Sequence, residues 1–80
     1  MKELIEYIVK SLVDEPEAVV VEEHNGRSLT TLELAVAQPD MGRVIGRNGR
    51  VINSIRLLLQ VRAAKEGQDA TLEVLEADKQ

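Results

Sequence analysis

The hydrophobic pattern of this chain switches repeatedly between helical and strand periods, and this constrains the fold more than any other feature of the sequence. Apolar residues recur at helical spacing over residues 2–13 and from Arg50 to about Lys65, where one face carries Ile52, Ile55, Leu59 and Ala63. Alternation typical of strands occupies Ala18–Glu23, Leu29–Ala37 and Ala70–Leu75. With a short helix before Gly46, the predicted order is α-β-β-α-α-β. This order indicates an α+β fold in which helices cover one face of a three-stranded sheet.

Turn and capping residues predict where these elements begin and end. Pro16 should end the first helix, and Asn25-Gly26 should supply the positive φ angles of a tight hairpin turn. Asp40 is a candidate N-cap for the short helix, which should stop at Gly46. Gly67 should stop the long helix.

The length and composition favour a single small domain. We expect residues 1–80 to form one domain, with a core of about residues 2–76 and a short polar C-terminal tail. The chain has no cysteine, which fits a reducing cytoplasm, and acids interrupt the apolar residues near Met1 where an export signal would be continuous. No apolar run approaches the roughly 18 residues of a membrane span. The expectation is therefore a cytoplasmic protein without a membrane segment.

The charges are unevenly distributed. The net charge is −4, yet six basic residues and no acid lie between Met41 and Lys65, namely Arg43, Arg47, Arg50, Arg56, Arg62 and Lys65. The remainder of the chain has four basic and fourteen acidic residues. Because cations that displace counterions drive binding to phosphates, this segment predicts a basic face suited to nucleic acid.

The most unusual element is a four-residue loop with glycine at both ends, Gly46-Arg47-Asn48-Gly49. Glycine lacks a Cβ, so the backbone can approach a phosphodiester closely. The loop opens the helix that begins at Arg50, whose unpaired N–H groups attract anions. Arg47 adds charge together with its neighbours Arg43 and Arg50, and Asn48 offers uncharged hydrogen bonds. The loop therefore predicts a clamp for a nucleic-acid backbone.

The motif from Val44 to Ile55, a hydrophobic pair, GxxG and two isoleucines three apart, resembles the KH family. The element order resembles the type II, prokaryotic variant, and the size resembles the small KhpA-like proteins. The resemblance implies single-stranded RNA across the loop, with bases in an aliphatic groove bordered by Val44, Ile45, Val51 and Ile52. It also implies an RNA chaperone or post-transcriptional regulator, pairing with a larger KH-containing RNA-binding protein, and influence on cell shape or envelope synthesis. The predicted RNA-binding residues are Arg43, Val44, Ile45, Gly46, Arg47, Asn48, Gly49, Arg50, Val51 and Ile52.

Other interpretations stay open beside this one. The loop could be a plain interhelical turn, or the domain could be a dimerisation or ribosome-docking module with incidental RNA contact. An enzyme is disfavoured because no nucleophile and base are paired, and the glycine spacing matches neither ATP-binding nor NAD-binding loops. No cofactor or metal is expected. His24 is interpreted as a solvated turn residue, and the following acids as solvated groups without ligand spacing: Asp14, Glu15, Glu17, Glu22 and Glu23.

The long helix has a second apolar stripe, formed by Leu57, Val61 and Ala64, nearly opposite its predicted core face. Either the first helix or the chain end covers this stripe, or it binds a partner. The second interpretation predicts a homodimer or a heterodimer, in which two weak RNA sites would act together on a longer RNA.

Overall fold

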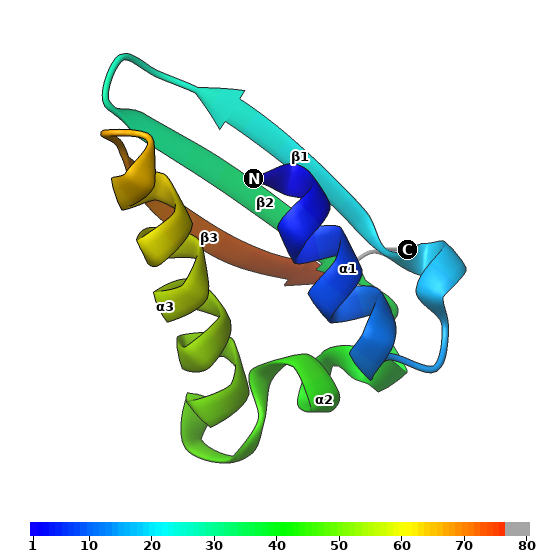
Figure 1. The fold of residues 1–80 in the computed structure, drawn as a ribbon. Coiled ribbons are helices and arrows are strands. Elements are labelled where there is room, and N and C mark those ends of the chain that lie inside the picture. The colour runs from blue at the N-terminus through cyan, green and yellow to red at the C-terminus, as the bar shows by residue number, and fades with distance from the viewer. Residues whose placement is uncertain (77–80) are drawn as a thin grey trace.

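The computed structural model describes residues 1–76 and contains one three-stranded sheet with helices on one of its faces (Figure 1). The elements are α1 (Lys2–Leu12), β1 (Val20–Asn25), β2 (Leu29–Val36), α2 (Met41–Ile45), α3 (Arg50–Lys65) and β3 (Asp69–Glu76). Single 3-10 turns occupy Pro16–Ala18, Gln38–Asp40 and Arg47–Gly49. The α+β class and the α-β-β-α-α-β order are confirmed.

The sheet is mixed, with strand order β1-β2-β3. The short connection makes β1 and β2 antiparallel, whereas β3 returns parallel to β2 after the chain has crossed over through α2 and α3. Thr30 of β2 is paired with Ala70 of β3, forty residues further along the chain. The GxxG loop therefore lies inside the crossover that joins two neighbouring strands.

The connection between β1 and β2 differs from the predicted tight turn. Among the described residues, positive φ angles occur at Gly46, Asn48, Gly49 and Gly67, and not at Asn25 or Gly26. Residues 26–28 lie outside the strands, and the Gly26 N–H donates to the Leu29 carbonyl oxygen at 2.7 Å. The hairpin is thus confirmed, but the prediction of a turn with positive φ at Asn25-Gly26 was wrong.

The core lies between the helices and the inner face of the sheet. Its members alternate along the strands and recur at helical spacing in α1 and α3: Ile5, Val9, Val21, Leu32, Leu34, Val36, Val44, Ile52, Ile55, Leu59, Ala63 and Leu72. The predicted core face of α3 is confirmed, because its four residues are all buried. Burial of each larger aliphatic side chain contributes about 1.5–3 kcal/mol, so α3 is attached firmly along its length.

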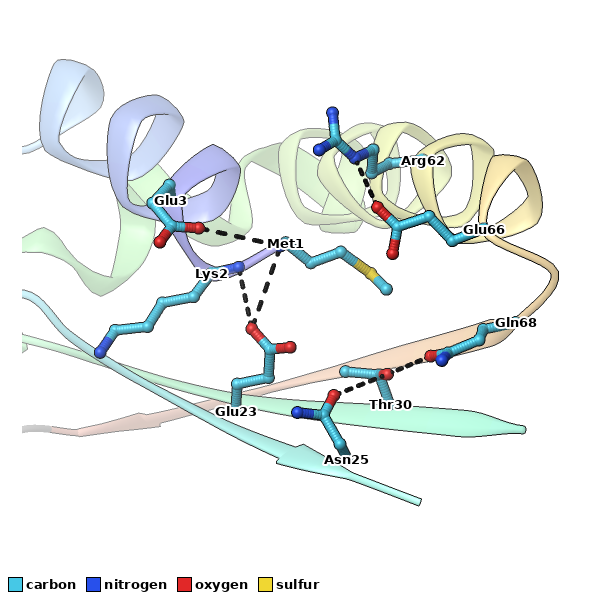
Figure 2. A network of polar contacts seen from close by, with 9 residues as sticks. All are labelled: Met1, Lys2, Glu3, Glu23, Asn25, Thr30, Arg62, Glu66 and Gln68. Atoms are coloured by element: carbon cyan, nitrogen blue, oxygen red, sulfur yellow. Dashed lines mark hydrogen bonds and ion pairs between the residues drawn. The ribbon is translucent and has the colours of Figure 1, made fainter. Parts of the chain in front are cut away.

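Polar side chains on the inner face of the sheet anchor the ends of the helices (Figure 2). Glu23 of β1 accepts a hydrogen bond from the Lys2 backbone N–H at 3.1 Å, which places a carboxylate at the positive end of α1. Thr30, which is fully buried, lies between the side-chain amides of Asn25 and Gln68. Its hydroxyl donates toward the amide oxygens of Asn25 and Gln68, which share its single hydrogen.

Candidate nucleic-acid interface

The GxxG loop is a compact turn with three special backbone conformations. Helix α2 ends at Gly46, whose φ is 77° and ψ is 171°, and Gly46 N–H donates to the Gly42 carbonyl oxygen at 2.8 Å. Asn48 and Gly49 both adopt left-handed angles, with φ of 55° and 75°. The Gly49 N–H closes the turn on the Gly46 carbonyl oxygen at 3.2 Å. The turn therefore carries the chain directly into α3.

The two glycines have different structural requirements. A Cβ on Gly46 would lie 2.4 Å from Val51 Cγ2 and 2.8 Å from the Val51 backbone nitrogen, so the turn packs against the first turn of α3. At Gly49 the nearest atom would be Asn53 Nδ2 at 3.6 Å, which is an ordinary contact distance. Gly46 thus fixes how closely the turn approaches α3, whereas Gly49 is required mainly for its backbone angles.

The start of α3 offers hydrogen-bond donors and positive charge in one place. Gly49 occupies the N-cap position and has no side chain with which to cap the helix. The Arg50 N–H already donates to the Arg47 carbonyl oxygen, and the N–H groups that follow it in the first turn of an uncapped helix lack internal partners and carry the positive end of the helix dipole. Arg47 and Arg50 are exposed and form no ion pair or side-chain hydrogen bond with any side chain of residues 1–75. This arrangement can hold an anion.

Arg43 differs from the other two arginines that were predicted to bind phosphates. Its Nη2 donates to Asp14 Oδ2 at 3.2 Å, and its Nε lies 3.9 Å from Asp40 Oδ1. Two carboxylates therefore partly neutralise Arg43. The positive charge at the turn comes mainly from Arg47 and Arg50.

The predicted aliphatic groove residues fall into two classes. Ile45 and Val51 are half-buried on either side of the turn, where part of each side chain meets solvent. Val44 and Ile52 lie in the core, with Val44 fully buried. Of these four side chains, only Ile45 and Val51 are accessible enough to contact a base. Val44 and Ile52 are buried in the core.

Two arginines farther along α3 have partners that the sequence pattern did not reveal. Arg56 donates through Nε and Nη2 to the Leu72 carbonyl oxygen on β3, at 3.3 and 3.2 Å. Its Nη1 also donates to Asn53 Oδ1 at 3.3 Å. Arg62 pairs with Glu66 at 3.1 Å, as is usual for residues four apart on a helix (Figure 2). These cations serve local structure, so the basic region is smaller than its composition indicates.

The open face of the sheet carries a group of possible metal ligands. One ligand atom each from Glu22, His24 and Glu33 lies within 4.8 Å of the others, and His24 Nε2 is 3.5 Å from Glu33 Oε1. The interpretation of His24 as a turn residue was wrong, because it lies on β1. Glu22 was also judged to lack ligand spacing, but cross-strand pairing with Glu33 brings the carboxylates together. Glu22 and His24 are exposed, and Glu33 is half-buried.

The predicted second stripe of α3 is open to solvent. Leu57, Val61 and their neighbour Leu58 are 62, 52 and 52% exposed, and Ala64 is exposed as well. The first helix therefore does not cover this stripe. Leu58 was missed because it lies between the two faces that helical spacing defines. We call Leu57, Leu58, Val61 and Ala64 the α3 apolar surface.

Comparison with known proteins places this geometry in a family. The family model described as "KhpA/KhpB, KH domain" matches residues 2–74, which is nearly the whole described chain and includes the GxxG turn. The chain belongs to the KhpA/KhpB KH-domain family. The mixed sheet and the α-β-β-α-α-β order are consistent with a type II KH domain. No solved structure matches the chain.

Relatives within the KhpA/KhpB family cover almost the entire chain. Proteins named RNA-binding protein KhpA from Chlamydia pneumoniae and Clostridium perfringens are 45 and 47% identical over 95 and 94% of this chain, and the matches cover 97 and 100% of those proteins. A protein of the same name from Borreliella burgdorferi is 49% identical over 92% of this chain and 90% of its own length. These names describe RNA-binding proteins and not enzymes, in agreement with the expectation from sequence. Within the described residues, no helix is both long and apolar enough to span a bilayer.

Proposed function

We propose that this KH domain binds single-stranded RNA by holding phosphates at the turn formed by Gly46, Arg47, Asn48 and Gly49. The observation that carries the proposal is the glycine-dependent approach of this turn to the uncapped start of α3, with Arg47 and Arg50 free of ion pairs among residues 1–75. Several relatives that match along nearly their whole length are named as RNA-binding proteins, which supports the same conclusion.

The proposed mechanism assigns a different task to each part of the site. Backbone N–H groups at the start of α3 and the two arginines bind phosphates, which fixes the RNA without reading its sequence. Bases then pack against Ile45 and Val51, the two half-buried aliphatic side chains beside the turn. Tyr7, the only aromatic residue of the chain, lies on α1 and is exposed, so the turn has no aromatic stacking platform. We expect weak binding with little sequence discrimination.

The cellular part of the proposal rests on family resemblance. It comprises action in the cytoplasm as an RNA chaperone or post-transcriptional regulator, pairing with a larger KH-containing RNA-binding protein, and an effect on cell shape or envelope synthesis. The α3 apolar surface supports the pairing, since contiguous exposed apolar side chains on one helix commonly mark a protein interface.

The test replaces the two central residues of the turn by acids, Arg47→Asp with Asn48→Asp. This keeps both glycines and the core but places negative charge where phosphates are proposed to bind, so RNA binding should be lost while circular dichroism shows a folded protein. The matched control is Arg27→Asp with Ser28→Asp, which changes the charge equally in the exposed β1–β2 connection. Equal binding by the folded turn variant and the control would contradict the proposal.

A milder change measures the phosphate contact itself. Arg47→Ala should weaken binding by about 1 kcal/mol for all sequences and reduce the salt slope by about one phosphate contact. If binding of wild type hardly changes between low and physiological salt, the second candidate function is favoured. In that candidate the α3 apolar surface mediates protein association and RNA contact is incidental.

A further inference from the structure

Asp40 is a buried acidic residue whose contacts join two distant segments of the chain. It is 1% exposed and lies directly before α2. Its two carboxylate oxygens accept hydrogen bonds from the backbone N–H groups of Asp14 and Glu15, each at 3.1 Å. The predicted N-cap hydrogen bond is absent, because both oxygens are directed to the loop that follows α1 instead.

This contact adds buried hydrogen bonds to the apolar contacts that hold α2 in position. A helix of five residues is too short to be stable by its own hydrogen bonds, so its orientation depends on tertiary contacts. Val44 anchors α2 in the core, Met41 and Ile45 pack partly buried against that core, and Asp40 attaches the start of α2 to the loop after α1. Without the contact at Asp40, the start of α2 would be held by apolar contacts alone, which are not directional and fix its orientation less specifically. Gly46, where the GxxG turn begins, directly follows the end of α2.

We propose that Asp40 is a positioning residue for the RNA site: its carboxylate fixes α2 and thereby holds the GxxG turn against the start of α3. This inference rests on the proposed RNA-binding function. Asp40 does not touch RNA, since its side chain is buried. It acts through the backbone path from α2 into the turn.

The negative charge of Asp40 should weaken RNA binding, whereas its proposed positioning role should strengthen RNA binding. Because the two effects have opposite signs, a mutation can separate them. Asp40 and Asp14 both lie beside Arg43, at 3.9 and 3.2 Å. Neutralising either acid removes one negative charge near a site that binds phosphates, so charge alone predicts tighter RNA binding in both variants. Asp40 holds α2 through hydrogen bonds to the Asp14 and Glu15 backbone N–H groups, whereas the Asp14 side chain contributes only an exposed contact with Arg43, in which an asparagine oxygen can still accept.

The experiment compares Asp40→Asn with Asp14→Asn, which carry the same charge change. An asparagine at position 40 keeps one acceptor oxygen but presents an NH₂ group to the second backbone donor, so one buried hydrogen bond is lost. We expect the folded Asp40→Asn protein to bind a short single-stranded RNA about fivefold more weakly than wild type. This is the effect of losing one contact between the displaced GxxG turn and a phosphate. Asp14→Asn should bind as well as wild type or more tightly.

Two further measurements complete the test. Amide hydrogen exchange should show that the Asp14 and Glu15 N–H groups are protected in wild type, that one of the two loses protection in Asp40→Asn, and that neither does in Asp14→Asn. Affinities are corrected for the folded fraction measured by circular dichroism. If Asp40→Asn does not fold in buffer, all three proteins are compared in trimethylamine oxide, which favours the compact state.

The outcomes distinguish this inference from the proposed function. Wild type that does not bind RNA would overturn the proposed function. Wild type that binds, together with a folded Asp40→Asn protein that binds as tightly as Asp14→Asn, would overturn the positioning role alone and leave Asp40 as a purely stabilising residue.

Discussion

Replacing each glycine of the segment from Gly42 to Gly49 by alanine should give three different changes in stability. Gly46 has φ of 77° and ψ of 171°, a region essentially restricted to glycine. An added Cβ would also lie 2.8 Å from the Val51 backbone nitrogen, which cannot rotate away as a side chain would. Strain and overlap together should cost about 3 kcal/mol or more.

The other two glycines provide internal comparisons. Gly49 is left-handed with φ of 75° and ψ of 16°, but has space for a methyl group, so alanine there should cost about 1–2 kcal/mol. Gly42 lies within α2 and a Cβ would meet nothing within 4 Å, so alanine should be neutral or stabilise by up to about 1 kcal/mol.

Urea denaturation followed by circular dichroism measures these differences. For a small domain with a slope of about 1 kcal/mol per molar urea, the midpoint should fall by about 3 M for Gly46→Ala and by about 1–2 M for Gly49→Ala. Since a domain of this size has only about 5 kcal/mol of stability, Gly46→Ala should be close to unfolding. Equal midpoints for Gly46→Ala and Gly49→Ala would refute the reasoning from backbone angles and the close contact with Val51.

Two other predictions concern the faces of α3. Ile55→Asp should unfold the protein, because an unpaired charge would replace a side chain that is 3% exposed in the core; a cooperative thermal melt near that of wild type would contradict this packing. Leu57→Lys with Val61→Lys should give a folded protein that remains monomeric at concentrations where light scattering detects association of wild type, whereas the control Ser54→Lys with Gln60→Lys should associate as wild type does. A wild type that is already monomeric at high concentration would exclude the homodimer and leave a different partner.

The parts of the fold that could be predicted are those governed by local pattern. The core face of α3 extends over four turns of regular spacing, so helical periodicity alone was enough to assign Ile52, Ile55 and Leu59 to the core. Gly46 and Gly67 end helices because of their positive φ, which is a property of glycine itself. The GxxG turn was identified for the same reason, since its backbone conformation depends on residues close together in sequence.

The features that were missed depend on pairing between distant residues. Asp40 satisfies the local rule for an N-cap, but its carboxylate binds N–H groups more than twenty residues away. His24 acquired Glu33 as a neighbour only through the strand register, and Arg43 and Arg56 are held by an acid of the first loop and a carbonyl of the last strand. Asn25, chosen as a turn residue, has its amide bound to Thr30. None of these contacts leaves a periodic signal in the sequence.

The parallel pairing of β2 with β3 constrains the order in which parts of the protein can fold. Strand β1 meets β2 through a short connection, but each residue of β2 meets its β3 partner forty positions later, after α2, the turn and α3 have been synthesised. Pairings that close long loops form slowly, so the sheet should be completed last. Arg56, which anchors α3 to β3, gains its carbonyl partner only at that stage. Before β3 pairs with β2, the chain therefore already contains the complete GxxG turn and α3, and this helix gains its contacts with the third strand only when β3 docks.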